Sequence, residues 1–278
     1  TLKDSDIIVQ RIYRNRTPLT GSFFLIDGTT FTTVAEGVDY FGNLGYPYQI
    51  EAGGVTLNAQ HDVTASGSFS GTGSLVKTGP GRLSLTGRYF GGPIDVREGG
   101  IGFGAQSVAT GAQVKMAGGT TVHLAFSSVG IGGAPEIDFD VDETTEGEVT
   151  ISIDFQADPL FNTEYPLFRS ISEAAAARLV ANGIQLRRAG QIQPAVQKER
   201  QFLLLPKLWT GGGAENTWQT AANWDSNKTP VRYDSLRFNG AGMFSVCDLA
   251  SVMMQNMTFE SGAWTVDVTN TTLAAAKS

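Results

Sequence analysis

Glycines divide residues 67–102 into short apolar runs in which apolar and polar positions alternate. Leu83 and Leu85 flank Ser84, so the two leucines point to one face of a strand and the serine points to the other. Successive runs follow one another at intervals of about ten residues, a rhythm typical of β-sandwiches, β-barrels and β-solenoids. The pattern predicts an all-β fold.

The turns between these runs favour a solenoid over hairpins. Two-residue hairpins prefer Asn-Gly or Asp-Gly, whereas many turns here are Gly-x-Gly or Gly-Gly, which suit corners where a strand turns onto the next face. We therefore predict a right-handed parallel β-helix in which each coil stacks on its neighbour. The residues expected to face inward are Leu75, Leu83, Leu85, Ile94, Val96 and Ile101.

One segment departs from the strand pattern and predicts a short helix over about 173–182. Ser170 and Glu173 have the spacing of a capping box, an alanine-rich stretch follows, and Gly183 is placed to end the helix. Its narrow apolar stripe predicts that the helix lies on the side of the β body. The stripe consists of Ala175, Ala176, Leu179 and Val180.

Residues 71–101 resemble the autotransporter-associated β-strand repeat, a GxGxLxKxGxGxLxLxGxNxYxGxTxVxxGxL unit. The glycine spacing and Lys77 carry the resemblance, whereas Arg88 stands where the repeat usually has Asn and Pro93 where Thr is common. The resemblance implies a passenger-type β-helix of a large bacterial surface protein. On this interpretation residues 67–102 form one full unit, the glycines occupy corners, and Lys77 marks an outer face.

A shift in composition near Pro206 divides the chain into two predicted blocks. Residues 1–206 form a β-helix block with the repeat and the lateral helix, and residues 207–278 form a second β-helix block opened by a tryptophan-rich loop. That opening is similar to one that recurs in long exported proteins carrying the same repeat. Together the blocks predict a dozen coils of about 20 residues and a rod on the order of 55 Å long.

Three tryptophans, Trp209, Trp218 and Trp224, lie within the opening of the second block. Closely spaced indole rings can form a platform on which a sugar stacks, or they can fix an irregular loop onto a core. The three residues are therefore candidates for weak glycan binding, with the structural role as the alternative.

Asp138, Asp140 and Asp142 share one face of a predicted strand, opposite Phe139 and Val141. Such a row of carboxylates can collect calcium or act as paired acids. The alternative is a solvated outer face, because carboxylates two residues apart on a strand are about 7 Å apart and repel one another.

Charge and cysteine content narrow the partners. The 278 residues carry a net charge of −7 with a pI near 4.9, and the basic residues are scattered, which argues against nucleic acid or anionic lipid as a ligand. Cys247 is the single cysteine, so the chain has no intrachain disulfide and no cysteine cluster for zinc. No run approaches the roughly 20 apolar residues of a membrane helix.

Few residues point to catalysis. His61 and His123 are the two histidines, and neither lies in a metal-binding or nucleophile motif. His61 next to Asp62 is the one conceivable acid–base pair. We expect no cofactor and no catalytic residues.

Three functional interpretations remain open at this stage. The first is an exported structural or adhesive β-helix, on the surface or outer membrane of a Gram-negative-type bacterium, which displays loops or self-assembles. Its expected partners are other surface proteins, copies of itself or glycans. The second is a β-helix that binds or cleaves polysaccharides, and the third is a surface domain with a β-sandwich fold.

Overall fold

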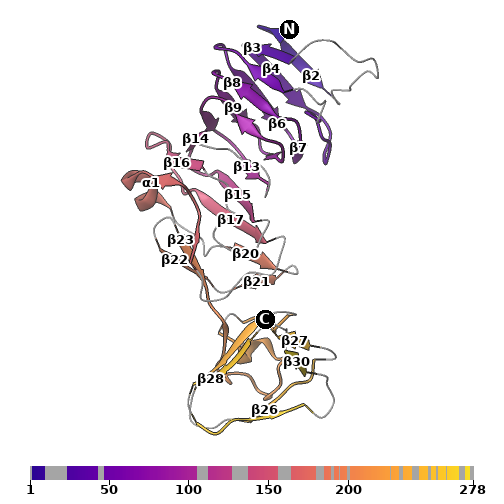
Figure 1. Ribbon diagram of the computed structural model, residues 1–278, viewed down its shortest axis with the longest axis vertical. Coiled ribbons are helices and arrows are strands. Elements are labelled where there is room, and N and C mark those ends of the chain that lie inside the picture. Colours follow the sequence, from indigo (N-terminus) through magenta and orange to yellow (C-terminus); the bar gives the residue numbers. More distant parts are fainter. Residues whose placement is uncertain are drawn as a thin grey trace. The chain divides into compact units, whose positions relative to one another are not determined.

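A computed structural model of the chain divides it into two compact units (Figure 1). The first contains Thr1–Ala157, Tyr165–Ile184 and Gln197–Phe202, and the second contains Asp158–Glu164, Gln185–Val196 and Leu203–Ser278. The structure describes residues 2–9, 24–42, 47–104, 112–126, 137–155, 164–179, 185–188, 191–193, 195–198, 201–225, 227–231, 234–239, 244–249, 252–254, 256–260, 262–268 and 273–275.

Three parallel sheets build the first unit, and the chain visits them in turn to form coils. Sheet 1 contains β1 (Leu2–Lys3), β3 (Phe24–Asp27), β5 (Tyr48–Ile50), β8 (Phe69–Gly71) and β11 (Tyr89–Phe90). Sheet 2 contains β2 (Asp6–Val9), β4 (Thr29–Thr33), β6 (Val55–Ala59), β9 (Leu75–Thr78), β12 (Ile94–Val96), β14 (Ala112–Met116), β16 (Ile137–Val141) and β19 (Ser170–Ile171). Sheet 3 contains, in this unit, β7 (Val63–Ala65), β10 (Arg82–Leu85), β13 (Gly100–Phe103), β15 (Thr121–Phe126) and β17 (Thr150–Phe155). The predicted parallel β-solenoid is confirmed.

The register gives the length of a coil. Leu75 pairs with Val55 of the preceding coil and with Ile94 of the next, which are steps of 20 and 19 residues. Because Leu75 and Ile94 occupy equivalent positions in neighbouring coils, residues 67–102 span nearly two coils. The prediction that this stretch is one unit is wrong.

Longer corner loops reduce the number of coils. Val122 pairs with Ile151, a step of 29 residues, because a loop is inserted between the two strands. The chain forms about 9 turns, so the predicted dozen is too many.

Apolar ladders fill the interior of the first unit. All six residues predicted to face inward are buried, each exposing at most 1% of its surface. Leu85, for example, stacks between Ala65 and Phe103, which are also buried. Each coil therefore removes the apolar face of its neighbour from water, the source of stability in a solenoid.

The helix α1 (Glu173–Arg178) packs beside β16, as predicted, but it begins and ends differently. Its N-cap is Ser172, whose hydroxyl accepts a hydrogen bond from the backbone N–H of Ala175 at 3.0 Å. Ser170 does not cap the helix because it belongs to β19, where it pairs with Asp138. The helix ends at Arg178, short of residue 182. Of the predicted apolar stripe, Ala175 and Leu179 are buried, Ala176 is half-buried, and Val180 lies outside the described residues, as does Gly183.

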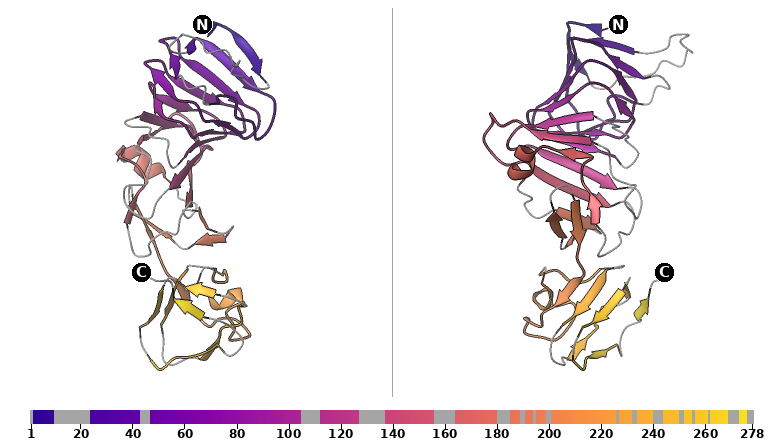
Figure 2. Two further views of the ribbon diagram at one scale, coloured as in Figure 1. Left: turned by 45° about the vertical axis from the view of Figure 1, so that its right-hand side comes forward. Right: turned by 60° about the vertical axis from the view of Figure 1, so that its left-hand side comes forward.

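The second unit also stacks parallel strands (Figure 2). Leu236 pairs with Met257 and Phe244 with Thr265, both at a step of 21 residues. The predicted restart of a solenoid in this part of the chain therefore agrees with its strand pairing. The parallel sets are β24 (Lys207–Trp209), β25 (Ser235–Phe238) and β28 (Asn256–Phe259); β26 (Phe244–Val246) and β29 (Thr265–Asp267); and β27 (Val252–Met254) and β30 (Leu273–Ala275).

The remaining elements are short. The unit contains the 3-10 helix η2 (Ala221–Asn223) and an antiparallel pair, β20 (Gln185–Arg188) with β21 (Gln191–Gln193). Three further strands contain borders between the units: β18 (Glu164–Pro166), β22 (Ala195–Lys198) and β23 (Gln201–Leu204). Among the described residues, no helix is long and apolar enough to cross a membrane.

Candidate functional site

The three tryptophans proposed for glycan stacking are core residues. Trp209, Trp218 and Trp224 expose no more than 2% of their surfaces and surround the buried ring of Phe238. Trp224 meets Trp209 and Trp218 edge-to-face, with ring centroids 5.1 and 5.9 Å apart. This is the geometry that aromatic quadrupoles favour in a packed core.

Hydrogen bonds hold the tryptophan loop against this core. The indole N–H of Trp218 donates to the hydroxyl of Ser245 at 3.2 Å, and that of Trp224 donates to the carbonyl of Trp218 at 3.1 Å. The buried amide of Asn223 ties the loop to itself by donating to the carbonyls of Glu215 and Thr217. No face of the three indole rings is presented to solvent, so the predicted stacking platform is contradicted and the structural role is supported.

Beside the tryptophan loop lies a buried ion pair that sequence reasoning missed. Lys207 and Asp234 have fully buried side chains with Nζ and Oδ2 3.1 Å apart, and the ammonium also donates to the carbonyl of Thr229 at 2.7 Å. The alternation in Lys207-Leu208-Trp209 contained the signal, because residues two apart on a strand share a face. A buried Trp209 requires an inward Lys207.

The three aspartates proposed for calcium point outward from β16 or follow it, and each has its own partners. Asp138 forms an ion pair with Arg169, and this guanidinium with the hydroxyl of Ser170 holds the pKa of the Asp138 carboxyl below its usual value. Asp140 accepts from Ser172 at 2.8 Å. The carboxylates do not converge.

Asp142 accepts hydrogen bonds from the hydroxyl and the backbone N–H of Thr144, and these bonds lower the pKa of its carboxyl. Within the part of the chain that the structure describes, no three His, Cys, Asp or Glu residues are grouped as a metal site. The arrangement fits the solvated outer face that we gave as the alternative.

The loop of residues 142–149 is held by one side chain of the helix. The guanidinium of Arg178 donates to three backbone carbonyls, those of Asp142, Thr145 and Gly147, at 2.5 to 2.7 Å. Charge-assisted bonds of this kind are stronger than neutral ones. The loop backbone is therefore fixed against α1.

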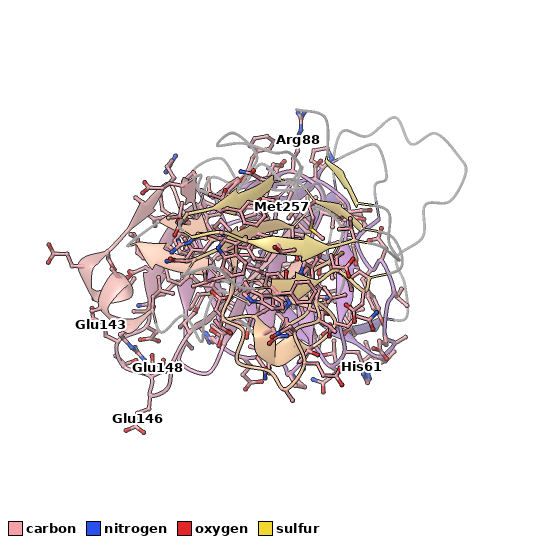
Figure 3. All side chains as sticks on the ribbon, turned by 90° about the horizontal axis from the view of Figure 1, so that it is seen from below. His61, Arg88, Glu143, Glu146, Glu148 and Met257 are labelled. Carbon is pink, nitrogen blue, oxygen red and sulfur yellow. The ribbon has the colours of Figure 1, made fainter. Side chains whose placement is uncertain are left out.

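This loop presents carboxylates to solvent. Glu143, Glu146 and Glu148 are exposed, and Figure 3 shows their side chains projecting away from the strands. Because Arg178 binds backbone oxygens, it leaves the three glutamate carboxylates available. We name residues 142–149 the acidic loop.

His61 and Asp62 do not form an acid–base pair in this arrangement. The carboxylate of Asp62 accepts from the backbone N–H of Arg82 at 2.8 Å and forms an ion pair with its guanidinium at 3.3 Å. His61 is exposed and lies at the periphery of its coil in Figure 3. Asp62 thus closes a corner between coils.

Lys77 is fully buried, so its predicted place on an outer face is wrong. Leu75 and Lys77 are two residues apart on β9, and the inward position of Leu75 therefore directs Lys77 inward as well. Lys77 stacks in the inner ladder between Leu57 and Val96. Sequence reasoning gave more weight to its charge than to its place in the alternation.

Burial lowers the pKa of Lys77 to about 8 from 10.5, while the negative charges of Glu98 and Asp62 act in the opposite direction. An unfolded chain keeps this proton up to about pH 10.5, so between pH 8 and 10 the unfolded state binds more protons than the folded state. Stability then rises with pH.

We expect the free energy of unfolding of the wild type to increase, relative to that of Lys77→Met, by about 1 kcal/mol per pH unit between pH 8 and 10. Urea titrations at intervals of half a pH unit measure this difference. The tyrosines are common to both proteins, so their ionisation cancels. A constant or falling difference across this range contradicts the assignment.

Comparisons with protein-family models, with curated proteins and with solved structures give no match for this chain.

Proposed function

We propose that this chain is an exported structural module of a bacterial cell surface, in which a stacked β-solenoid presents corner loops to other surface proteins or to copies of itself. In this role the protein has no catalytic step and requires no cofactor. The observation that carries the proposal is the acidic loop, whose backbone is fixed by Arg178 while Glu143, Glu146 and Glu148 face solvent.

The use of the candidate site residues also supports a structural role. The indole rings pack in a core, Asp62 pairs with Arg82, and Asp138 pairs with Arg169. Each group that sequence reasoning nominated for chemistry holds part of the fold together. The resemblance of residues 71–101 to a repeat of surface proteins supports the location.

Antibodies raised against the purified chain test the proposed location. We expect them to label intact cells of the source bacterium, and we expect protease added outside the cells to remove the label. A periplasmic and a cytoplasmic marker protein, both labelled only after permeabilisation, serve as controls. Labelling that requires permeabilisation contradicts the proposal.

A further inference from the structure

The ammonium of Lys77 is enclosed by backbone carbonyl oxygens. It donates to the carbonyls of Thr78 at 2.8 Å, Gly79 at 2.8 Å and Glu98 at 3.1 Å. A lysine ammonium has three protons and no acceptor, so three carbonyls match its full capacity. We name these three oxygens the carbonyl cradle.

The carbonyl cradle joins two coils. Thr78 and Gly79 lie at the corner that follows β9, whereas Glu98 lies at the equivalent corner after β12, one coil further along. The same two corners are linked a second time, because the backbone N–H of Gly79 donates to the Glu98 carboxylate at 2.9 Å. Lys77 therefore makes a polar crosslink at the edge of an apolar interior.

The corner has little space for another arrangement. Gly79 has a φ of 78°, and a Cβ there would lie 2.6 Å from the carbonyl oxygen of Ala59 in the preceding coil. The carbonyls around it cannot easily turn to water. Each would lose a hydrogen-bond partner if the ammonium were removed.

A charge in this position is otherwise unfavourable. Its neighbours in the ladder, Leu57 and Val96, are apolar and buried, and an ammonium without partners in such surroundings costs several kcal/mol. The charged groups at the corner are Glu98 and Asp62, and Asp62 is itself paired with Arg82. The carbonyl cradle and these carboxylates offset the desolvation.

We propose that the Lys77 ammonium is a tethered cation bound in the carbonyl cradle, which holds two successive corners of the solenoid together. The site is selective for a primary ammonium group, since it offers three acceptors to three N–H donors. Shortening the side chain to alanine leaves space for the missing propylammonium portion. The truncated protein then becomes a receptor for that ion.

The experiment is chemical rescue of Lys77→Ala at pH 7. We expect the substitution to lower the urea midpoint by about 1 M, since donors to buried carbonyls are lost. Propylammonium chloride should raise the midpoint of the variant in a saturable manner. Tetramethylammonium chloride, which cannot donate N–H bonds, should give no such rise at the same ionic strength.

The matched control is Lys115→Ala. Lys115 is exposed on the outer face of β14, and its variant should show no rescue by propylammonium. Equal effects of the two ammonium salts on Lys77→Ala, or rescue of the Lys115 variant as well, would overturn the proposal.

If Lys77→Ala does not fold, Lys77→Met decides the question, because methionine fills similar space without a donor. A lower urea midpoint than that of the wild type at pH 7 supports the tethered cation. A midpoint equal to or above that of the wild type overturns it.

Discussion

Replacing Leu85 with aspartate is expected to unfold the first unit at room temperature. Leu85 is 1% exposed and stacks between Ala65 and Phe103 in sheet 3, where no cation is aligned with it in the register. An unpaired carboxylate at this position loses its hydration, and the leucine packing is lost as well. Together these effects cost more than about 4 kcal/mol, a large share of the stability of a domain.

Far-ultraviolet circular dichroism and thermal melting measure this effect. The control is Ser84→Asp, one residue earlier on β10, where the side chain points outward and is half-buried. We expect that variant to keep its β spectrum and to lose only about 1 kcal/mol. A Leu85→Asp protein with the wild-type spectrum and melting temperature would show that the inward assignment is wrong.

Replacing Trp218 with alanine is expected to destabilise the second unit by about 3–5 kcal/mol, the range found for large aromatic residues removed from cores. The substitution removes the ring contacts with Trp224 and Phe238 and the hydrogen bond to Ser245. Urea denaturation followed by tryptophan fluorescence measures the loss. Trp264 is only partly buried, so Trp264→Ala should cost clearly less.

The same variant separates a core role from glycan binding. On a glycan array, a Trp218→Ala protein of unchanged stability that loses binding shown by the wild type would mean that the indole ring contacts sugar. The burial of the ring leads us to expect the opposite result. Stability should fall, and no sugar binding should depend on Trp218 in the folded protein.

The alternation of apolar and polar residues was sufficient to predict the fold and its interior. Leu83 and Leu85 are inward because a strand places residues two apart on one face, and this geometry is local. Applied consistently, the same rule also places Lys77 inward. That error came from assigning a charged residue to the surface without considering that backbone carbonyls at a corner could bind it.

Local signals were less successful where a residue has a distant partner. Ser170 fits a capping box in sequence but pairs with Asp138 in a strand, and the helix is capped by Ser172 instead. The roles of Trp218 and Trp224 depended on Phe238, which closes their core from another strand. The spacing of tryptophans along the chain does not contain this information.

By itself, the sequence determined that the chain is all-β, that its strands turn at glycine corners, and which apolar side chains face inward, because each follows from the geometry of a few consecutive residues. Only the tertiary structure decided the register between coils, and with it the partners of Lys77 and Asp138. Those partners lie 21 and 31 residues away along the chain. Their contact depends on the length of the loops between stacked strands, which no local pattern specifies.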